Sequence, residues 1–283
     1  MKFGFTEEQN AMRATIRGFL SAKSPETEVR RLMATDIGYS PSVWKQMADE
    51  MGLQGLAIPE SYGGSGFTQI ELGIVFEEMG RAAFGGPFFA SVALGASVLL
   101  FTEDDDAKSD YLPGIASGDL IATVALVEPH GSWELDAVHM QAQPDASGYR
   151  LNGTKQFVLD GHNADVVFVA ARIDGDLSVL AVGADAEGLT RTPLATLDQT
   201  RKQSRLDFDD VYARLIGRVG DGREVFARAG ELAVVALAAE QVGGAQRVLD
   251  AAVDYAKVRV QFGRPIGSFQ AIKHKCADML LQV

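Results

Sequence analysis

The sequence contains one cysteine, Cys276, among its 283 residues. One thiol cannot build an internal disulfide framework, and this scarcity is typical of the reducing cytoplasm, where we expect the protein. Cys276 lies in an amphipathic stretch, which favours a packing role over a nucleophilic one. The four histidines lack the spacing of metal ligands, so no metal site is expected.

Long apolar runs and an excess of basic charge are also missing. The apolar stretch from Leu94 to Phe101 is far shorter than the ~20 residues that span a bilayer, and no charged-then-apolar leader opens the chain. The net charge of −12 excludes a broad nucleic-acid-binding face, although a local cationic pocket for phosphates is compatible with it. We therefore expect a soluble protein of one large or two to three small domains.

Residues 1–120 have a helical pattern. Thr6, with Gln9 three positions later, predicts a capping box at the first helix. Residues 59–66 read P-E-S-Y-G-G-S-G, and this density of proline and glycine predicts an ordered loop. Apolar residues at helical spacing predict further helices over 42–51, 68–81 and 84–100.

The pattern changes near Gly118. An apolar, β-branched run over 120–127 predicts a buried strand. Asn152-Gly153 and Asp174-Gly175 are hairpin signals, so an antiparallel sandwich or barrel is expected. Further strands are predicted over 139–143, 149–151, 157–159, 165–171, 177–182 and 205–211.

The helical period returns near Asp221, and residues 225–257 predict one long helix rich in alanine and glycine. Gly263 and Pro265 predict its end, since glycine accepts a left-handed cap and proline cannot continue the helix. Arg259, Gln261 and Phe262 gather at this corner. A capped helical hairpin with a buried phenylalanine is the structural alternative to a binding site.

Residues 259–272 read R-x-Q-F-G-x-P-I-x-x-F-Q-A-I, which resembles a block of the acyl-CoA dehydrogenase family, and the loop at 59–66 resembles a second hallmark of that family. The resemblance covers the whole chain. It implies an α+β multidomain fold, with an N-terminal helical domain (1–120), a middle antiparallel β domain (121–217) and half of a C-terminal four-helix bundle (218–283). Because the last residues carry no helix stop signal, we expect the bundle to be truncated.

The resemblance also implies function. Family members are FAD-dependent oxidoreductases that desaturate an acyl-CoA thioester in fatty-acid or sterol side-chain β-oxidation. A carboxylate removes the α proton, a hydride leaves for the flavin N5, and an electron-transferring flavoprotein accepts the electrons. Tetramers or dimers, of like or unlike subunits, are expected. Across the subunit interface, the FAD of a neighbour would be bound by Arg259, Gln261, Phe262, Phe269 and Gln270.

The flavin-facing side of the family's own subunit is less well matched. Residues 125–134 correspond to its T-E-P-x-x-G-S-D loop, with Leu126 beside the ring, Val127 in place of a hydrogen-bonding threonine, and Ser132 as a phosphate or substrate contact. In the family's W-I-T-N strand, Phe157 replaces the stacking tryptophan and Leu159 replaces a second threonine. A plain apolar strand is the alternative for this segment.

The catalytic base has no clear counterpart. Most members carry it beyond the position of Val283, and the Glu-Arg pair used by a minority falls on Ala233 and Val234 here. Glu240 is the remaining candidate, because burial would raise its pKa, although an inter-helix hydrogen-bond network also suits it. No residue is therefore assigned as the base.

Three functional hypotheses remain. The first is a catalytic acyl-CoA dehydrogenase or a subunit of one, and the second is a non-catalytic structural subunit that completes a partner's FAD site. The third keeps the fold but changes the reaction, as in acyl-CoA oxidases, nitroalkane oxidases and flavin-dependent hydroxylases.

Overall fold

A computed structural model describes residues 4–283, and the chain divides into two compact units. One unit joins the segment up to Glu26 with Gly73–Phe84 and Leu237–Val283. The other joins Thr27–Leu72 with Gly85–Ala236. Helices α4 and α7 each pass from one unit into the other, so the three-domain boundaries expected from the sequence stay a prediction.

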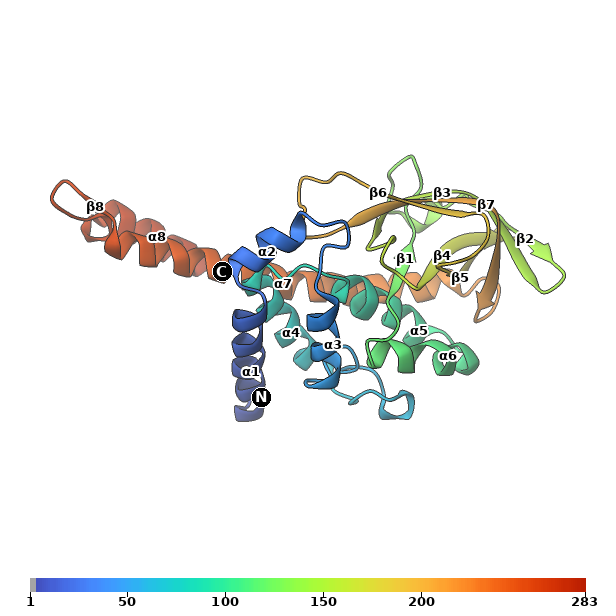
Figure 1. Cartoon of the computed structure of the whole chain (residues 1–283), viewed down its shortest axis with the longest axis horizontal. Coiled ribbons are helices and arrows are strands. Elements are labelled where there is room, and N and C mark those ends of the chain that lie inside the picture. The colour runs from blue at the N-terminus through green and yellow to red at the C-terminus, as the bar shows by residue number, and fades with distance from the viewer. Residues whose placement is uncertain (1–3) are drawn as a thin grey trace. The chain divides into compact units, whose positions relative to one another are not determined.

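The first unit is helical (Figure 1). It contains α1 (Glu7–Lys23), most of α4 (Gln69–Ala82), the second part of α7 (Gly222–Val258) and α8 (Gln270–Gln282). The capping box at Thr6 is confirmed, since its hydroxyl accepts from the Gln9 backbone and the Gln9 side chain accepts from the Thr6 backbone. No helix within residues 4–283 has both the length and the apolarity to cross a membrane.

A close approach between α4 and α7 holds this unit together. A Cβ placed on Gly80 would overlap the Glu240 carbonyl oxygen, and one placed on Gly243 would overlap the Glu77 carbonyl oxygen. The small residues of α7 therefore let two helix backbones meet. Beside this contact, the buried Glu78 carboxylate accepts hydrogen bonds from Arg17 at 2.6 and 2.8 Å.

The second unit combines a sheet with helices. The helices are α2 (Glu26–Met33), α3 (Pro41–Asp49), η1 (Glu60–Tyr62), η2 (Phe89–Ala96), α5 (Ser97–Phe101) and α6 (Asp105–Ala116). Of these, α5 and α6 lie on one side of the strands (Figure 1). The helix predicted over 84–100 starts only at Phe89, because two glycines and Pro87 precede it, and η2 has π geometry. Ser91 of η2 accepts a hydrogen bond from the Ala122 backbone at 3.1 Å, which fixes the first strand against this helix.

A seven-stranded sheet occupies the centre of the second unit, in the order β1-β4-β5-β7-β3-β2, with β6 paired to β7. We expected a purely antiparallel sheet, but β1 and β4 run parallel, so the sheet is mixed. The two strands can run parallel because the β2–β3 hairpin lies in the connection between them. The strands are β1 (Ala122–Ala125), β2 (Ala142–Asp145), β3 (Gly148–Leu159), β4 (Val166–Ile173), β5 (Asp176–Gly183), β6 (Leu189–Pro193) and β7 (Gln203–Ile216).

Two features of the sheet differ from the predicted strands. The segments 149–151 and 157–159 belong to one strand, β3. The pairing of β3 with β7 shifts register between Lys155 and Val158. β6 was not predicted, since its exposed, polar residues lack apolar alternation. β7 bends across the sheet, pairing with β3 and β6 along most of its length and with β5 near Ile216.

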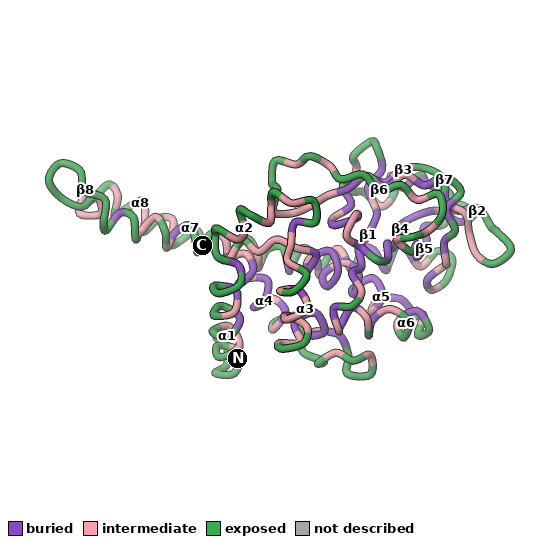
Figure 2. Tube along the Cα trace, in the orientation of Figure 1, coloured by how far each residue is buried: buried purple, intermediate pink, exposed green. Residues whose placement is uncertain are grey.

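The apolar core of the second unit lies between this sheet and the helices η2, α5, α6 and the start of α7 (Figure 2). Phe168 of β4 is fully buried, and the Tyr111 ring meets it edge-on at 5.7 Å. Val225 and Phe226 anchor the start of α7 in the same cluster. This core gives the loop after β1 a rigid base, and the candidate site is built on that loop.

Candidate functional site

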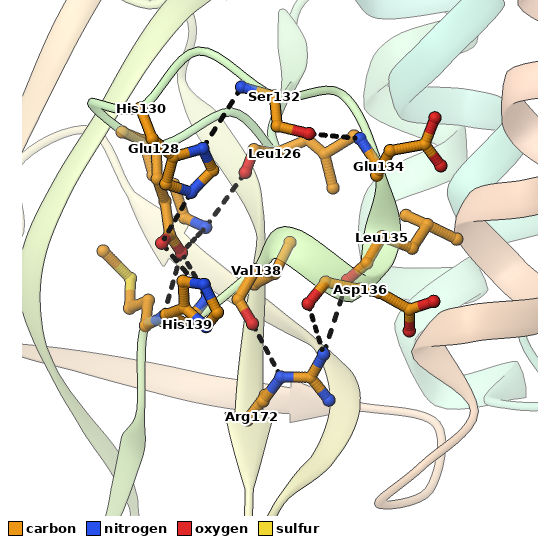
Figure 3. A network of polar contacts seen from close by, with 12 residues as sticks. Leu126, Glu128, His130, Ser132, Glu134, Leu135, Asp136, Val138, His139 and Arg172 are labelled. Carbon is orange, nitrogen blue, oxygen red and sulfur yellow. Dashed lines mark hydrogen bonds and ion pairs between the residues drawn. The ribbon is translucent and has the colours of Figure 1, made fainter.

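A buried ion pair anchors the loop that follows β1 (Figure 3). The Lys155 ammonium of β3 donates to Glu128 Oε1 at 2.9 Å and to the Leu126 carbonyl at 3.1 Å. Burial lowers the pKa of Lys155 to about 8, and the Glu128 charge opposes that shift. Burial also disfavours the Glu128 carboxylate, but the Lys155 charge and backbone donors outweigh it and hold the pKa of Glu128 below its ordinary value.

The same carboxylate organises the far end of the loop. Glu128 accepts hydrogen bonds from the backbone N–H groups of His139 and Met140 at 2.9 to 3.1 Å. Arg172 of β4 donates to the carbonyls of Val138 at 2.6 Å and Gly175 at 2.8 Å, and also reaches those of the short η3 turn (Leu135–Ala137). The loop is thus tied at both ends to the sheet.

Between these anchors the loop presents polar groups. The Ser132 N–H donates to His130 Nδ1 at 3.2 Å, and the Ser132 hydroxyl accepts from the Glu134 N–H at 3.2 Å (Figure 3). Ser132 is half-buried, whereas the neighbouring Trp133 side chain is 65% exposed. The structure therefore places Ser132, the expected phosphate or substrate contact, in an ordered turn.

A bulge in β3 turns Phe157 outward. Phe157 has a left-handed φ of 54° at the register shift in β3, and its side chain is 40% exposed. The Gln156 N–H donates to the Val127 carbonyl at 2.8 Å, which joins the bulge to the loop after β1. Val127 is buried and Leu159 half-buried, and neither has a polar side-chain atom. An exposed ring is available here without the two hydroxyl groups of the family pattern.

Asp160, directly after this strand, is a buried carboxyl group that the sequence did not single out. Its Oδ1 accepts from Asn163 Nδ2 at 3.0 Å, and its backbone adopts a φ of 50°. Burial raises the pKa of Asp160 from 3.8 to about 6, against the opposing effect of the Asn163 hydrogen bond and nearby cations.

We expect Asp160→Asn to stabilise the protein above pH 7 by roughly 1–3 kcal/mol. The unfolded carboxyl ionises near pH 3.8 and the folded one near 6, so wild-type stability falls as the pH rises between these values and stays lower above them. The amide cannot ionise, so the gain should vanish near pH 4. Urea unfolding at pH 4 and pH 8 measures it. Asp174→Asn is the control, because Asp174 shares the positive φ but is exposed. A gain of equal size at both pH values would contradict this assignment.

The residues expected to reach a neighbour lie on a short hairpin of the first unit. α7 ends at Val258, and β8 (Val260–Gln261) pairs with β9 (Arg264–Pro265) before the η4 turn (Ile266–Ser268). Phe262 and Gly263 form the turn with φ of 54° and 76°. Gly263 therefore adopts the left-handed region as predicted, but in a two-residue hairpin and not as the cap of α7.

This hairpin is exposed. The Phe262 side chain is 90% exposed, which contradicts the alternative of a buried phenylalanine. Its ring meets Phe269 edge-on at 6.1 Å, and Arg259, Gln261 and Gln270 are exposed as well. The structure thus brings Arg259, Gln261, Phe262 and Phe269 together on one small element.

The candidate bases lie on α7. Glu240 is half-buried at the contact with α4, where its carbonyl oxygen faces Gly80. Ala233 is buried and Val234 exposed, and neither can accept a proton. The position of Glu240 at a helix contact suits the structural alternative, a hydrogen-bond network between helices.

Sequence reasoning also missed Lys155 and Arg172. The buried positions of β3, which are Leu151, Lys155 and Val158, do not alternate, so the sequence gives no signal that Lys155 is buried. No local pattern points to Arg172, whose partners are backbone carbonyls.

The chain thus combines an α–β–α order of segments, an anchored loop after β1 and, separately, an exposed arginine–phenylalanine hairpin. The sequence matches the acyl-CoA dehydrogenase N-terminal domain over residues 6–119, the middle domain over 123–211 and the C-terminal domain over 220–283. The chain belongs to the acyl-CoA dehydrogenase family.

Individual relatives agree. A probable acyl-CoA dehydrogenase of Bacillus subtilis, YngJ, is 32% identical over 100% of this chain and 77% of its own length. The solved ChsE4-ChsE5 complex from Mycobacterium tuberculosis has 31% identity and a TM-score of 0.88, covering 98% of this chain and 74% of the other. The Tcur3481-Tcur3483 steroid ACAD has 31% identity and a TM-score of 0.86, with the same coverage.

The residues present fit FAD in part. The exposed Phe157 ring suits stacking on an isoalloxazine, and the exposed Arg259 suits a diphosphate, because a planar guanidinium donates parallel hydrogen bonds. At Val127 and Leu159 the chain offers no side-chain hydrogen-bond donor. Side chains suited to stacking and to a phosphate contact are therefore present, and hydroxyl groups at positions 127 and 159 are not.

Proposed function

We propose that this chain is a subunit of an FAD-dependent acyl-CoA dehydrogenase, and that its main contribution to flavin binding is the hairpin it lends to a neighbouring subunit. One observation carries the proposal. The exposed hairpin retains Arg259, Gln261 and Phe262, whereas the chain's own flavin-facing positions, Val127 and Leu159, have lost their hydroxyl groups.

The neighbour would be an unlike subunit of the same family that carries the catalytic base. The similarity to the ChsE4-ChsE5 complex supports this arrangement. The substrate class would be the CoA thioester of a steroid side chain or fatty acid, and the similarity to a steroid ACAD favours the steroid class. An electron-transferring flavoprotein would accept the electrons.

A catalytic subunit is the second candidate, favoured by Ser132 and the outward Phe157, which keep part of a flavin site.

Bound FAD would supply the acceptor for a hydride from the acyl β carbon. This chain's residues would bind and orient. Arg259 would hold the diphosphate through charge-assisted hydrogen bonds, and Phe262 would pack beside the adenosine half. In the catalytic candidate, Phe157 would stack on a flavin ring held by this chain, while the Lys155–Glu128 pair keeps the loop after β1 rigid. Orientation of that ring would depend on stacking and backbone contacts, because Val127 and Leu159 cannot hydrogen-bond it.

The visible absorption spectrum of the purified protein tests the proposal. The chain should be colourless when expressed alone and should give a yellow complex, with about half an FAD per chain, when co-expressed with a homologous subunit. A flavin band near one FAD per chain in the lone protein would instead favour the catalytic candidate. A colourless preparation in both cases, from folded protein, would overturn both candidates.

A further inference from the structure

The exposed hairpin at 260–265 has an unusual residue in its turn. Phe262 has a left-handed φ of 54°, a backbone conformation that residues other than glycine rarely adopt. Its side chain is also 90% exposed, although exposing an aromatic ring to water is unfavourable. Strain and apolar exposure at one tip indicate that the surrounding structure holds the ring in place.

The support beneath the tip is a stack of side chains. The Phe262 ring meets the half-buried Phe269 ring at 6.1 Å with an interplanar angle of 88°. On Phe269 lies the guanidinium of Arg264, with its central carbon 4.1 Å from the ring centroid. Arg264, Phe269 and Phe262 thus form one continuous contact, in which a cation–π interaction orders the ring that the tip residue leans on.

The base of the stack is fixed to α7. The Ile266 N–H donates to the Arg259 carbonyl at 2.8 Å, and the Phe269 N–H donates to the Ile266 carbonyl at 3.1 Å. Gly267 lies so close to the end of α7 that an added Cβ would come within 2.9 Å of the Ala256 carbonyl oxygen. The backbone on either side of Phe269 therefore has little freedom. The β8–β9 pairing fixes the backbone of the tip, and the side-chain stack orients the Phe262 ring.

We propose that Arg264 is a positioning residue for flavin binding, which acts through Phe269 to hold Phe262 in the orientation that the neighbour's cofactor requires. This inference rests on the proposed function, since it assumes that the hairpin contacts FAD. Within residues 4–283, Arg264 forms no ion pair, so its fixed position depends on the aromatic ring and not on a carboxylate.

A double-mutant cycle tests the pathway from Arg264 to the tip. Arg264→Gln removes the cation, Phe269→Leu removes the ring, and FAD affinity is measured by fluorescence titration of the apo oligomer that contains this chain. We expect each single change to weaken binding about tenfold and the double change to weaken it no further, because both break the same stack. Arg264→Lys should restore part of the loss, since it keeps the charge.

Two outcomes would overturn the role of Arg264. One is wild-type affinity in Arg264→Gln, and the other is a loss of about a hundredfold in the double variant, the product of the single effects, which would mean that Arg264 contacts the ligand independently of Phe269. Arg228→Gln is the matched control, because Arg228 makes a similar 4.2 Å contact with Phe101 in the other unit. It should leave FAD affinity unchanged.

A ligand-free measurement separates this proposal from the proposed function. NMR signals of 13C-labelled phenylalanine rings should show Phe262 shifted and broadened in Arg264→Gln and close to wild type in Arg264→Lys. An unchanged Phe262 signal in Arg264→Gln would sink the positioning role whether or not FAD binds. Conversely, if Arg264→Gln disorders Phe262 while Arg259→Ala keeps wild-type FAD affinity, Arg264 does hold the Phe262 ring, but the hairpin is not lent to a flavin.

Discussion

Lys155→Met should lower the free energy of unfolding by about 3–5 kcal/mol, the largest loss expected from one side chain here. The change leaves the Glu128 carboxylate buried without its cation, which lies at 2.9 Å in the wild type. Two backbone N–H donors remain on Glu128 but cannot replace a full charge. Chemical denaturation at neutral pH measures the loss.

The matched control is Lys45→Met. Lys45 pairs with Asp119 at 2.6 Å, but both side chains are well exposed, and pairs of this kind contribute about 1 kcal/mol or less. The double variant Lys155→Met with Glu128→Gln should recover part of the loss, because no unpaired charge is then buried. If Lys155→Met proves as mild as Lys45→Met, the buried pair does not anchor the loop as described.

Gly80→Ala should destabilise the protein by about 3 kcal/mol, although alanine favours helix over glycine. The new methyl group would overlap the backbone carbonyl oxygen of Glu240, and a backbone atom cannot move aside as a flexible side chain does. Helices α4 and α7 would have to separate, which would also disturb Gly243 against Glu77. Thermal unfolding should show a clear fall in Tm.

Gly73→Ala gives the opposite expectation in the same helix. A Cβ at Gly73 meets no atom within 4 Å, so alanine should stabilise the helix by up to ~1 kcal/mol. The two changes are chemically identical and differ only in what the methyl group meets. Equal effects from Gly73→Ala and Gly80→Ala would contradict the close α4–α7 contact.

Much of the fold follows from local sequence signals. Helical periodicity placed α3, α4 and α7 to within a few residues, and apolar β-branched runs placed β4 and β5. The parallel pairing of β1 with β4 could not be predicted from alternation, because it depends on how a long connection returns to the sheet. The polar edge strand β6 was missed because its residues do not alternate between apolar and polar.

The candidate site was predictable where a motif carries it. The arginine–phenylalanine block located the hairpin, but its geometry was wrong in the prediction, since Phe262 and Gly263 form a two-residue turn between strands. Lys155, Arg172 and Asp160 were missed because their importance comes from burial and partners far apart in the sequence. The roles assigned to Val127, Ser132 and Leu159 in flavin binding remain proposals.

Paired variants directly test the asymmetry between the lent hairpin and the chain's own flavin side. Arg259→Ala and Phe157→Ala are each introduced into this chain, the oligomer is purified, and bound FAD is quantified by visible absorption. We expect Arg259→Ala to remove most of the flavin and Phe157→Ala to leave it nearly unchanged. Loss of flavin in Phe157→Ala with retention in Arg259→Ala would contradict the account and identify this chain as the one that holds its own cofactor.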